Sequence, residues 1–261
     1  MPERTPLVEF RDATVVLGGT SALDRVTLTL DRGVNVAILG PNGSGKSTLV
    51  RTIAGDCRVM ADGVGSVRLL GKDRWSLFDL REHLGVVSDD LQAVCSRPIT
   101  ARAAILGGFF GSIGVYPHQH VTPAMRRRAD EVLGFLGIAH LADRRMDTLS
   151  TGEARRALIG RALAHDPEVL ILDEPYDGLD PSARFHVREL LRTLARDGTS
   201  LVLVTHDIAD IVPEVTRVVL MRDGRVVADV PKSEALTSER LSALFGFPAA
   251  VTEREGYYHL W

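Results

Sequence analysis

The chain has 261 residues, of which 45% are hydrophobic, and this suffices to bury the core of one large domain. Its formal net charge of -3 argues against a dedicated binder of nucleic acids or anionic membranes, which would carry a strong basic excess. Cys57 and Cys95 lie far apart, which argues against a disulfide framework or a metal knuckle, and no apolar run has the length of a signal peptide or a membrane span. We therefore expect a globular protein in a reduced, cytoplasmic setting.

The first part of the chain is rich in strand-forming segments. Gly18-Gly19 separates the first two of them, which predicts antiparallel strands. A helix is expected over residues 49–54, ending at Gly55. The strands in this part are predicted at residues 7–17, 26–30, 36–39, 66–70 and 84–88.

The stretch that follows the strand at 36–39 matches the phosphate-binding pattern G-x-x-x-x-G-K-[ST]. Glycines in such a loop let backbone N–H groups surround a polyphosphate, while a lysine and a hydroxyl complete the site. An apolar strand before the loop and a helix after it are the context that the pattern requires. The residues expected to bind a nucleotide are Gly40, Pro41, Asn42, Gly43, Ser44, Gly45, Lys46, Ser47 and Thr48.

Residues 96–148 change character and become rich in alanine, leucine and arginine at helical spacing. We interpret this region as a helical subdomain inserted at about residues 89–150. Within it, the aromatic stretch 109–116 either packs internally, which is the more common case, or docks a partner. His118 and His120 lack a third metal ligand at useful spacing, so a metal site is not favoured.

Three groups of arginines are expected on solvated helix faces, with a docking surface for an acidic partner as the alternative. They are Arg126-Arg127-Arg128, Arg144-Arg145 and Arg155-Arg156.

The second half alternates strands and helices. Apolar runs at 169–172 and 200–204 lack polar alternation, which indicates parallel strands covered on both faces. Further elements are expected as a helix over 182–196, a hairpin around Asp223-Gly224, a helix over 233–245 and a hairpin around Glu255-Gly256.

Polar residues follow the two buried strands at the point where each strand ends. Ligands of open α/β sheets collect outside the carboxyl ends of the strands. Asp173 could hold Mg²⁺ together with Ser47, and Glu174 could orient or deprotonate a water aimed at a γ-phosphate. His206 should emerge at the same edge, where it could contact that phosphate.

Residues 149–153 precede another helical pattern. Ser150 and Glu153 have the spacing of a capping box, with Ser150 as the N-cap. A helix start that carries Ser150 and Gly152 is also a good anion site, because free N–H groups and the helix dipole favour phosphate.

Together, and in this order, these motifs resemble the ATP-binding cassette (ABC) ATPase family over about residues 7–232. The matching segments are Walker A at Gly40–Thr48, the signature at Leu149–Glu153, Walker B at Val169–Glu174, the D-loop at Gly178–Asp180 and the switch histidine His206. The resemblance implies a P-loop NTPase core with a mainly parallel sheet, an N-terminal antiparallel β-subdomain, the helical insertion, and a C-terminal helix and tail at 233–261. It also implies a head-to-tail dimer with each ATP between one Walker A and the Ser150 and Gly152 of the other copy.

Some positions depart from the family pattern. Leu17 stands where an aromatic residue usually stacks on the base, so adenine would be held by apolar contact. The family's Mg²⁺-sensing glutamine is replaced by Asp89, with Gln92 three residues later, so either residue could contact the metal or the coupling is altered. The signature has Thr151 and Glu153 where glycine and glutamine are commonest. This combination of departures resembles a side branch that includes molybdate-type and solitary cassettes.

The leading hypothesis is the ATPase subunit of an ABC transporter, cytoplasmic or peripheral on the inner face of the membrane. It would use ATP and Mg²⁺, pair with a second cassette and drive a separate membrane permease, with no nucleic-acid partner. The alternative is a soluble ABC ATPase with a regulatory, repair or translation role. Nucleotide binding without turnover is disfavoured because the residues expected to perform hydrolysis are all present, namely Lys46, Asp173, Glu174 and His206.

Overall fold

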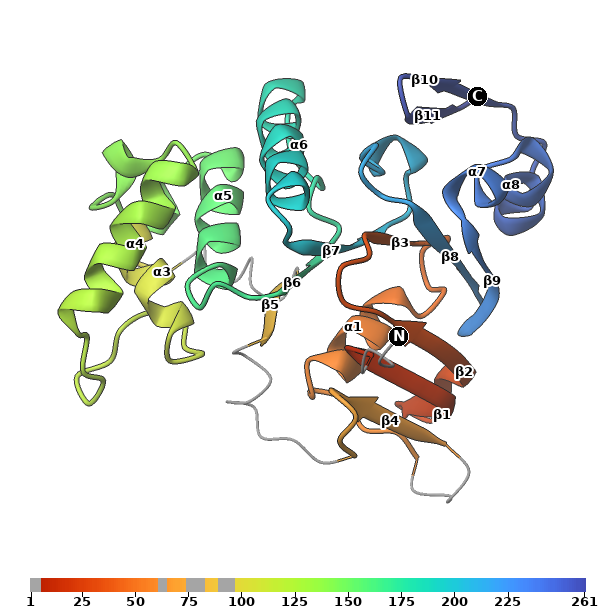
Figure 1. The fold of residues 1–261 in the computed structure, drawn as a ribbon, viewed down its shortest axis with the longest axis horizontal. Coiled ribbons are helices and arrows are strands. Elements are labelled where there is room, and N and C mark those ends of the chain that lie inside the picture. Colours follow the sequence, from red (N-terminus) through yellow and green to blue (C-terminus); the bar gives the residue numbers. More distant parts are fainter. Residues whose placement is uncertain (1–5, 61–64, 74–82, 89–96) are drawn as a thin grey trace.

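A six-stranded sheet runs through the middle of the computed structural model, which describes residues 6–60, 65–73, 83–88 and 97–261 (Figure 1). Neighbouring strands are parallel except for the last pair, β8 and β9. In spatial order the strands are β5 (Leu84–Val87), β6 (Val169–Asp173), β7 (Ser200–Thr205), β3 (Val36–Leu39), β8 (Arg217–Arg222) and β9 (Arg225–Pro231). Every residue of β3, β6 and β7 is buried, as continuous apolar runs predict.

A smaller antiparallel sheet packs beside the central one at the N-terminal end of the chain (Figure 1). Its strands, in the order β2-β1-β4, are Thr20–Leu30, Val8–Leu17 and Ser66–Leu69. Gly18 and Gly19 form the turn between β1 and β2, both with positive φ, which L side chains rarely adopt. Helix α1 (Lys46–Ile53) shares a hydrophobic core with this sheet and one face of the central sheet.

Helices replace strands in the middle of the chain, as the composition predicts. They are α3 (Ala101–Gly108), α4 (Pro123–Phe135), α5 (Thr151–Ala162) and two 3-10 turns, Ala139–Leu141 and Met146–Thr148. They pack with one another and with helix α6 (Pro181–Arg196) in a second core. Figure 1 shows α3, α4 and α5 grouped on the side away from the N-terminal sheet. The boundaries of the helical insertion and of the segment after residue 232 stay predictions.

The C-terminal segment contains two helices and a hairpin. The single helix predicted over 233–245 is wrong, because the chain forms α7 (Lys232–Ala235) and then α8 (Ser238–Phe245). The break comes at Thr237, which is extended and whose hydroxyl caps α8 by accepting from the N–H of Arg240. The hairpin predicted around Glu255-Gly256 is present as β10 (Val251–Arg254) and β11 (Tyr257–Leu260).

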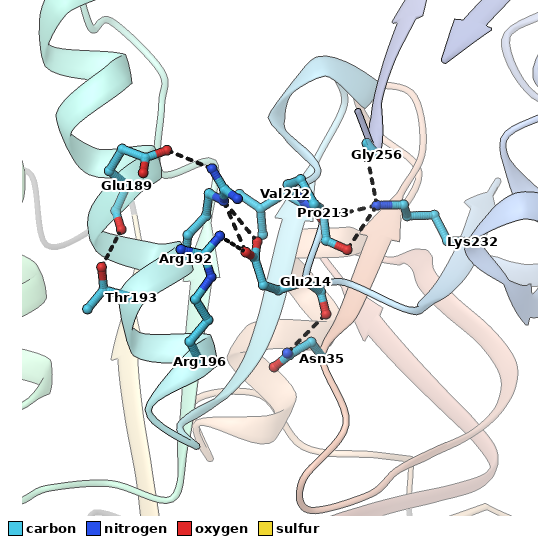
Figure 2. Close-up of polar contacts among 10 residues, drawn as sticks. All are labelled: Asn35, Glu189, Arg192, Thr193, Arg196, Val212, Pro213, Glu214, Lys232 and Gly256. Atoms are coloured by element: carbon cyan, nitrogen blue, oxygen red, sulfur yellow. Dashed lines mark hydrogen bonds and ion pairs between the residues drawn. The ribbon is translucent and has the colours of Figure 1, made fainter. Parts of the chain in front are cut away.

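A buried lysine anchors this hairpin to the loop that precedes β8 (Figure 2). The ammonium of Lys232 donates to the carbonyls of Val212, Pro213 and Gly256 at 3.2, 3.4 and 3.0 Å. Gly256 belongs to the turn between β10 and β11. The Lys232 side chain therefore links this hairpin to the loop before β8.

Candidate functional site

The predicted phosphate-binding loop connects the buried strand β3 to helix α1 at the centre of the molecule. Gly43 and Gly45 have φ of 80° and 98°, which L residues rarely adopt. A Cβ at Gly45 would stand 2.6 Å from the carbonyl oxygen of Ala22 on strand β2, so the loop is pressed against the N-terminal sheet. The sequence pattern is therefore folded as the loop that it predicts.

Among the described helices of eight or more residues, α1 alone begins without a side-chain cap. Its N-cap position, Gly45, makes no side-chain hydrogen bond to the first turn. Helices α3, α4, α5, α6 and α8 are capped by Thr100, Thr122, Ser150, Asp180 and Thr237. Within the described residues the hydroxyl of Ser44 is buried with no hydrogen-bond partner. Free N–H groups and a buried donor at a helix start favour an anion such as phosphate.

We expect Gly45→Ala to remove nucleotide binding and to lower the free energy of unfolding by about 1 to 3 kcal/mol, because the new Cβ is strained at this φ and clashes with backbone. Isothermal titration and urea denaturation would measure the two effects. Gly134→Ala is the matched control, since this glycine lies in α4 and a Cβ added there would have no atom within 4 Å. It should stabilise the protein by about 0.5 to 1 kcal/mol with binding intact. Equal behaviour of the two variants would contradict the assignment.

The predicted acids and the histidine lie at the same edge of the sheet as the loop. Strand β7 stands between β6 and β3, and the three strands end level with one another. Asp173 pairs with Val204, and Leu39 pairs with Thr205. The residues that follow, Glu174, His206 and Gly40, therefore emerge together, as the rule for parallel strand ends predicts.

Lys46, Glu174 and His206 meet around one carboxylate oxygen. Nδ1 of His206 lies 2.9 Å from Oε1 of Glu174, and Nζ of Lys46 lies 3.8 Å from the same oxygen. Nζ of Lys46 also donates to the carbonyls of Gly40 and Pro41 at 2.8 and 3.2 Å. Glu174 and Lys46 are buried, whereas the His206 side chain is 40% exposed, so the carboxylate oxygen lies inside the protein and the imidazole reaches the surface.

The electrostatics of the three groups follow from this geometry. Burial lowers the pKa of Lys46, although the charges of Glu174 and Asp173 oppose the change. The hydrogen bond with Glu174 raises the pKa of His206, so the imidazolium form is favoured beside that carboxylate. A carboxylate beside an imidazole can hold a water and accept its proton.

Asp177 is a fourth charged residue at this place, and the sequence reasoning did not single it out. Its N–H donates to the carbonyl of Glu174 in a tight turn, at 3.2 Å. One ligand atom each from Asp177, Glu174 and His206 lie within 4.8 Å of one another. Glu174 has a positive φ of 48°, which turns the chain back on itself. The sequence carried one signal for Asp177, which is a carboxylate placed three residues after Glu174 with Pro175 between them.

The signature residues form a second group, at the starts of α5 and α6. The capping box is confirmed, because the Ser150 side chain accepts from the N–H of Glu153 and the Glu153 carboxylate accepts from the N–H of Ser150. Ser150 is exposed, and Gly152 is packed so tightly that a Cβ would lie 2.5 Å from Cβ of Ala183. Asp180 caps α6 beside them. Helix α5 packs against α3 and α6, whereas α1 packs against β2 and β6.

The expectation of solvated arginines is wrong for Arg155. This side chain is 2% exposed and donates to the carbonyl of Asp177 at 3.3 Å, so it joins the signature helix to the turn after Glu174. The reason is its position on α5, one turn after Gly152, which packs against Ala183 of α6. Other arginines pair at the surface, for example Arg145 with Asp147.

The remaining predicted positions are placed as follows. Ser47 is exposed at the start of α1, and Leu17 is 40% exposed at the end of β1. Asp89 and Gln92 lie outside the described residues, and so does Cys95. His118 stacks near Tyr116, with ring centroids 6.0 Å apart, and belongs to no cluster of metal ligands within the described ranges.

A comparison with protein families identifies the chain. The sequence model of the family described as ABC transporter matches residues 23–177. The chain belongs to this family. The match begins in β2 and contains the phosphate-binding loop, the signature and Walker B. Among the residues that the structure describes, no helix combines the length and the apolar character needed to cross a membrane.

Curated relatives agree with this identification. The ferric enterobactin transport ATP-binding protein FepC of Escherichia coli is 30% identical over 97% of this chain and 92% of its own length. The hemin import ATP-binding protein HmuV of Bradyrhizobium diazoefficiens is 31% identical over 96% of this chain and 92% of its own length. An ABC transporter ATP-binding protein of Saccharolobus solfataricus is 35% identical over 87% of this chain. The matched region covers only 43% of the length of that relative.

Solved structures share the fold along most of the chain. CbiO1 of Clostridium perfringens, part of the ABC transporter complex CbiONQ, is 29% identical with a TM-score of 0.74, over 92% of this chain and 94% of that one. The ATP-binding cassette MJ0796, seen as a dimer bound to ADP and Pi, is 27% identical with a TM-score of 0.71, over 86% and 98%. The predicted fold class is confirmed.

The branch within the family is not resolved by these matches. ModF of Escherichia coli is 35% identical over 80% of this chain, but this chain covers only 43% of ModF, and import proteins of other substrate classes match as closely. The molybdate-type or solitary assignment therefore stays a prediction.

Proposed function

We propose that this cassette binds ATP at the loop of residues 40–48 and hydrolyses it at Glu174. One observation carries the proposal: the ammonium of Lys46 and the imidazole of His206 converge on one oxygen of Glu174, directly beside the uncapped start of α1. The helix start would receive the phosphates, and Lys46 would contact the β- and γ-phosphates. Glu174 would then accept a proton from the attacking water, while His206 fixes the γ-phosphate.

Mg²⁺ fits the residues that would hold it. The hydroxyl of Ser47 and the carboxylate of Asp173 are hard oxygen ligands, which this cation prefers. Within the described residues Oε2 of the buried Glu174 has no hydrogen-bond partner, as expected of a group that faces a polar ligand. When bound, the ion would neutralise charge that develops on the phosphates.

The second group of residues is proposed to act on a second copy of the chain. Ser150, Gly152 and Asp180 share one end of the neighbouring helices α5 and α6, and Ser150 and Asp180 are exposed. In a head-to-tail pair, Ser150 and Gly152 would close the phosphate site of the partner. The dimeric state of the related cassette MJ0796 supports this arrangement.

We propose further that the ATP cycle drives a separate membrane permease. This proposal is supported by the sequence similarity to FepC and HmuV, which are named for transport and import. This chain covers almost the whole length of both relatives. CbiO1, a part of a transporter complex, has the same fold at 29% identity. The cassette would then act on the inner face of the membrane, and import is the direction that the relatives favour.

Reconstitution tests this proposal. The chain should co-purify with a membrane permease, and that permease in lipid vesicles should change the ATPase rate of the chain several-fold. A rate indifferent to any permease would contradict the transport role. Salt-sensitive binding of the chain to DNA or ribosomes would instead favour the soluble regulatory, repair or translation role.

A further inference from the structure

Four arginines stand at four-residue intervals on helix α6 and therefore lie on one face. They are Arg184, Arg188, Arg192 and Arg196. All four side chains bond to the chain just after the switch histidine. We name residues 205–214, which contain His206, the switch segment.

At the start of α6 the contacts reach the residues closest to the histidine. The guanidinium of Arg184 lies 2.7 Å from Oδ1 of Asp210 and 3.3 Å from Oδ2 of Asp207. One turn later, Arg188 donates to the carbonyl of Ala209 at 3.2 Å. The first half of the helix therefore holds the first half of the switch segment.

At the far end of α6 the contacts reach the end of the segment (Figure 2). Arg192 donates to both carboxylate oxygens of Glu214 at 3.0 and 3.2 Å, and Arg196 lies 2.7 Å from one of them. The carbonyl of Glu214 accepts from the side chain of Asn35 at 3.1 Å. This end is remote from the chemistry and more exposed, since the Arg196 side chain is 54% exposed.

The ion pair of Arg184 with Asp210 is connected by hydrogen bonds to the residues on both sides of His206. Asp210 is 1% exposed, and its Oδ2 accepts from the hydroxyl of Thr205 at 2.9 Å. That hydroxyl also accepts from the N–H of Asp207 at 3.0 Å. Since Thr205 and Asp207 are the neighbours of His206, both sides of the histidine backbone are tied to Asp210.

The charge of Asp210 depends on its arginine partner. Burial raises the pKa of Asp210 to about 6, and the charges of Asp207 and Glu174 act in the same direction. Arg184 is the largest opposing influence, followed by the hydrogen bond from Thr205. Without Arg184 the carboxylate would lose its main favourable charge interaction.

We propose that Arg184 and Asp210 are positioning residues for ATP hydrolysis: they fix the strand end that carries His206 to helix α6, so that the histidine stays in contact with Glu174. The inference rests on the proposed role of His206 in hydrolysis. It also joins the switch histidine to helix α6, whose N-cap is Asp180.

The test compares steady-state ATP hydrolysis by full-length variants. Arg184→Gln and Asp210→Asn should each lower kcat by roughly 10- to 100-fold with the KM for ATP within about twofold, because the histidine is displaced while the phosphate loop is intact. Arg184→Lys should restore part of the rate. Arg196→Gln is the matched control on the same helix face and should keep kcat within about twofold.

A second comparison separates positioning from simple stabilisation. In a His206→Ala background, adding Arg184→Gln should change kcat less than about twofold, since interacting residues are non-additive. Full losses in both backgrounds, or an equal loss in Arg196→Gln, would overturn the proposal. A wild-type kcat in both Arg184→Gln and Asp210→Asn would also overturn it. Thermal melting identifies a variant that fails to fold, and the kcat of the folded variant then tests the proposal. Wild-type turnover in His206→Ala itself would instead refute the role of the histidine in the proposed function.

Discussion

Replacing Glu174 with glutamine is expected to lower ATP hydrolysis by roughly 100- to 10,000-fold while ATP binding persists. The amide has nearly the shape of the carboxylate but cannot accept a proton from the attacking water. The side chain sits beside Lys46 and His206 and is largely buried, so solvent offers no ready substitute for the lost base. Phosphate release would measure turnover, and fluorescent ATP would measure binding.

The same variant should accumulate a stable dimer when ATP is present. ATP that is bound but not cleaved would keep the two cassettes closed on each other, which size-exclusion chromatography with light scattering would detect. Glu168→Gln is the matched control. Glu168 directly precedes the same strand at its other end and pairs with Arg32 and His83 at the surface. It should keep turnover within about twofold. Unchanged turnover in Glu174→Gln would remove Glu174 from its role.

Replacing Lys46 with methionine is expected to weaken ATP binding by about 2 to 5 kcal/mol, or at least about 30-fold in Kd. The methionine keeps the length and the apolar stem, but the ammonium that would face the phosphates is gone. Burial lowers the pKa of Lys46, and the charge of Glu174 opposes that change. The ammonium also donates to a loop carbonyl. The phosphates of ATP would add a further favourable interaction with this charge. Isothermal titration calorimetry with ATP checks this directly.

Lys232→Met is the matched control for this variant. Lys232 is also a buried lysine that donates to backbone carbonyls, and burial lowers its pKa too. Its loss leaves buried acceptors unpaired and should lower the free energy of unfolding by about 1 to 3 kcal/mol. ATP affinity should stay within about twofold, since Lys232 lies at the C-terminal hairpin. Equal weakening of ATP binding in both variants would show that lysine burial, and not the phosphate contact, decides affinity.

Local patterns predicted much of the fold because they express local physics. The runs at 169–172 and 200–204 became buried parallel strands, since a strand covered on both faces has no polar alternation. The hairpin at Glu255-Gly256 followed from its turn residues. The prediction of one helix over 233–245 was wrong because Thr237 caps a new helix instead of continuing the first one. Helical spacing of apolar residues does not distinguish these two outcomes.

Predictions about side chains were limited by what packs against them. Arg155 looks like a surface residue in sequence, yet it is buried because α6 covers that face of α5. Asp177 was missed because its closeness to His206 depends on the turn after Glu174 and on the neighbouring strand β7. In both cases the decisive neighbour is distant in the chain.

The sequence by itself predicted the phosphate-binding pattern, the acids at the end of β6, a role for His206 and the order in which they occur, because each is a short local feature with its own chemistry. Only the tertiary structure decided that Lys46 and His206 share one oxygen of Glu174, and that the arginines of α6 hold the switch segment. The four-residue spacing of those arginines is visible in sequence, but their acidic partners are not. Those pairings arise from the parallel order of β6, β7 and β3, which brings α6 against the segment after β7, and no local preference encodes that contact.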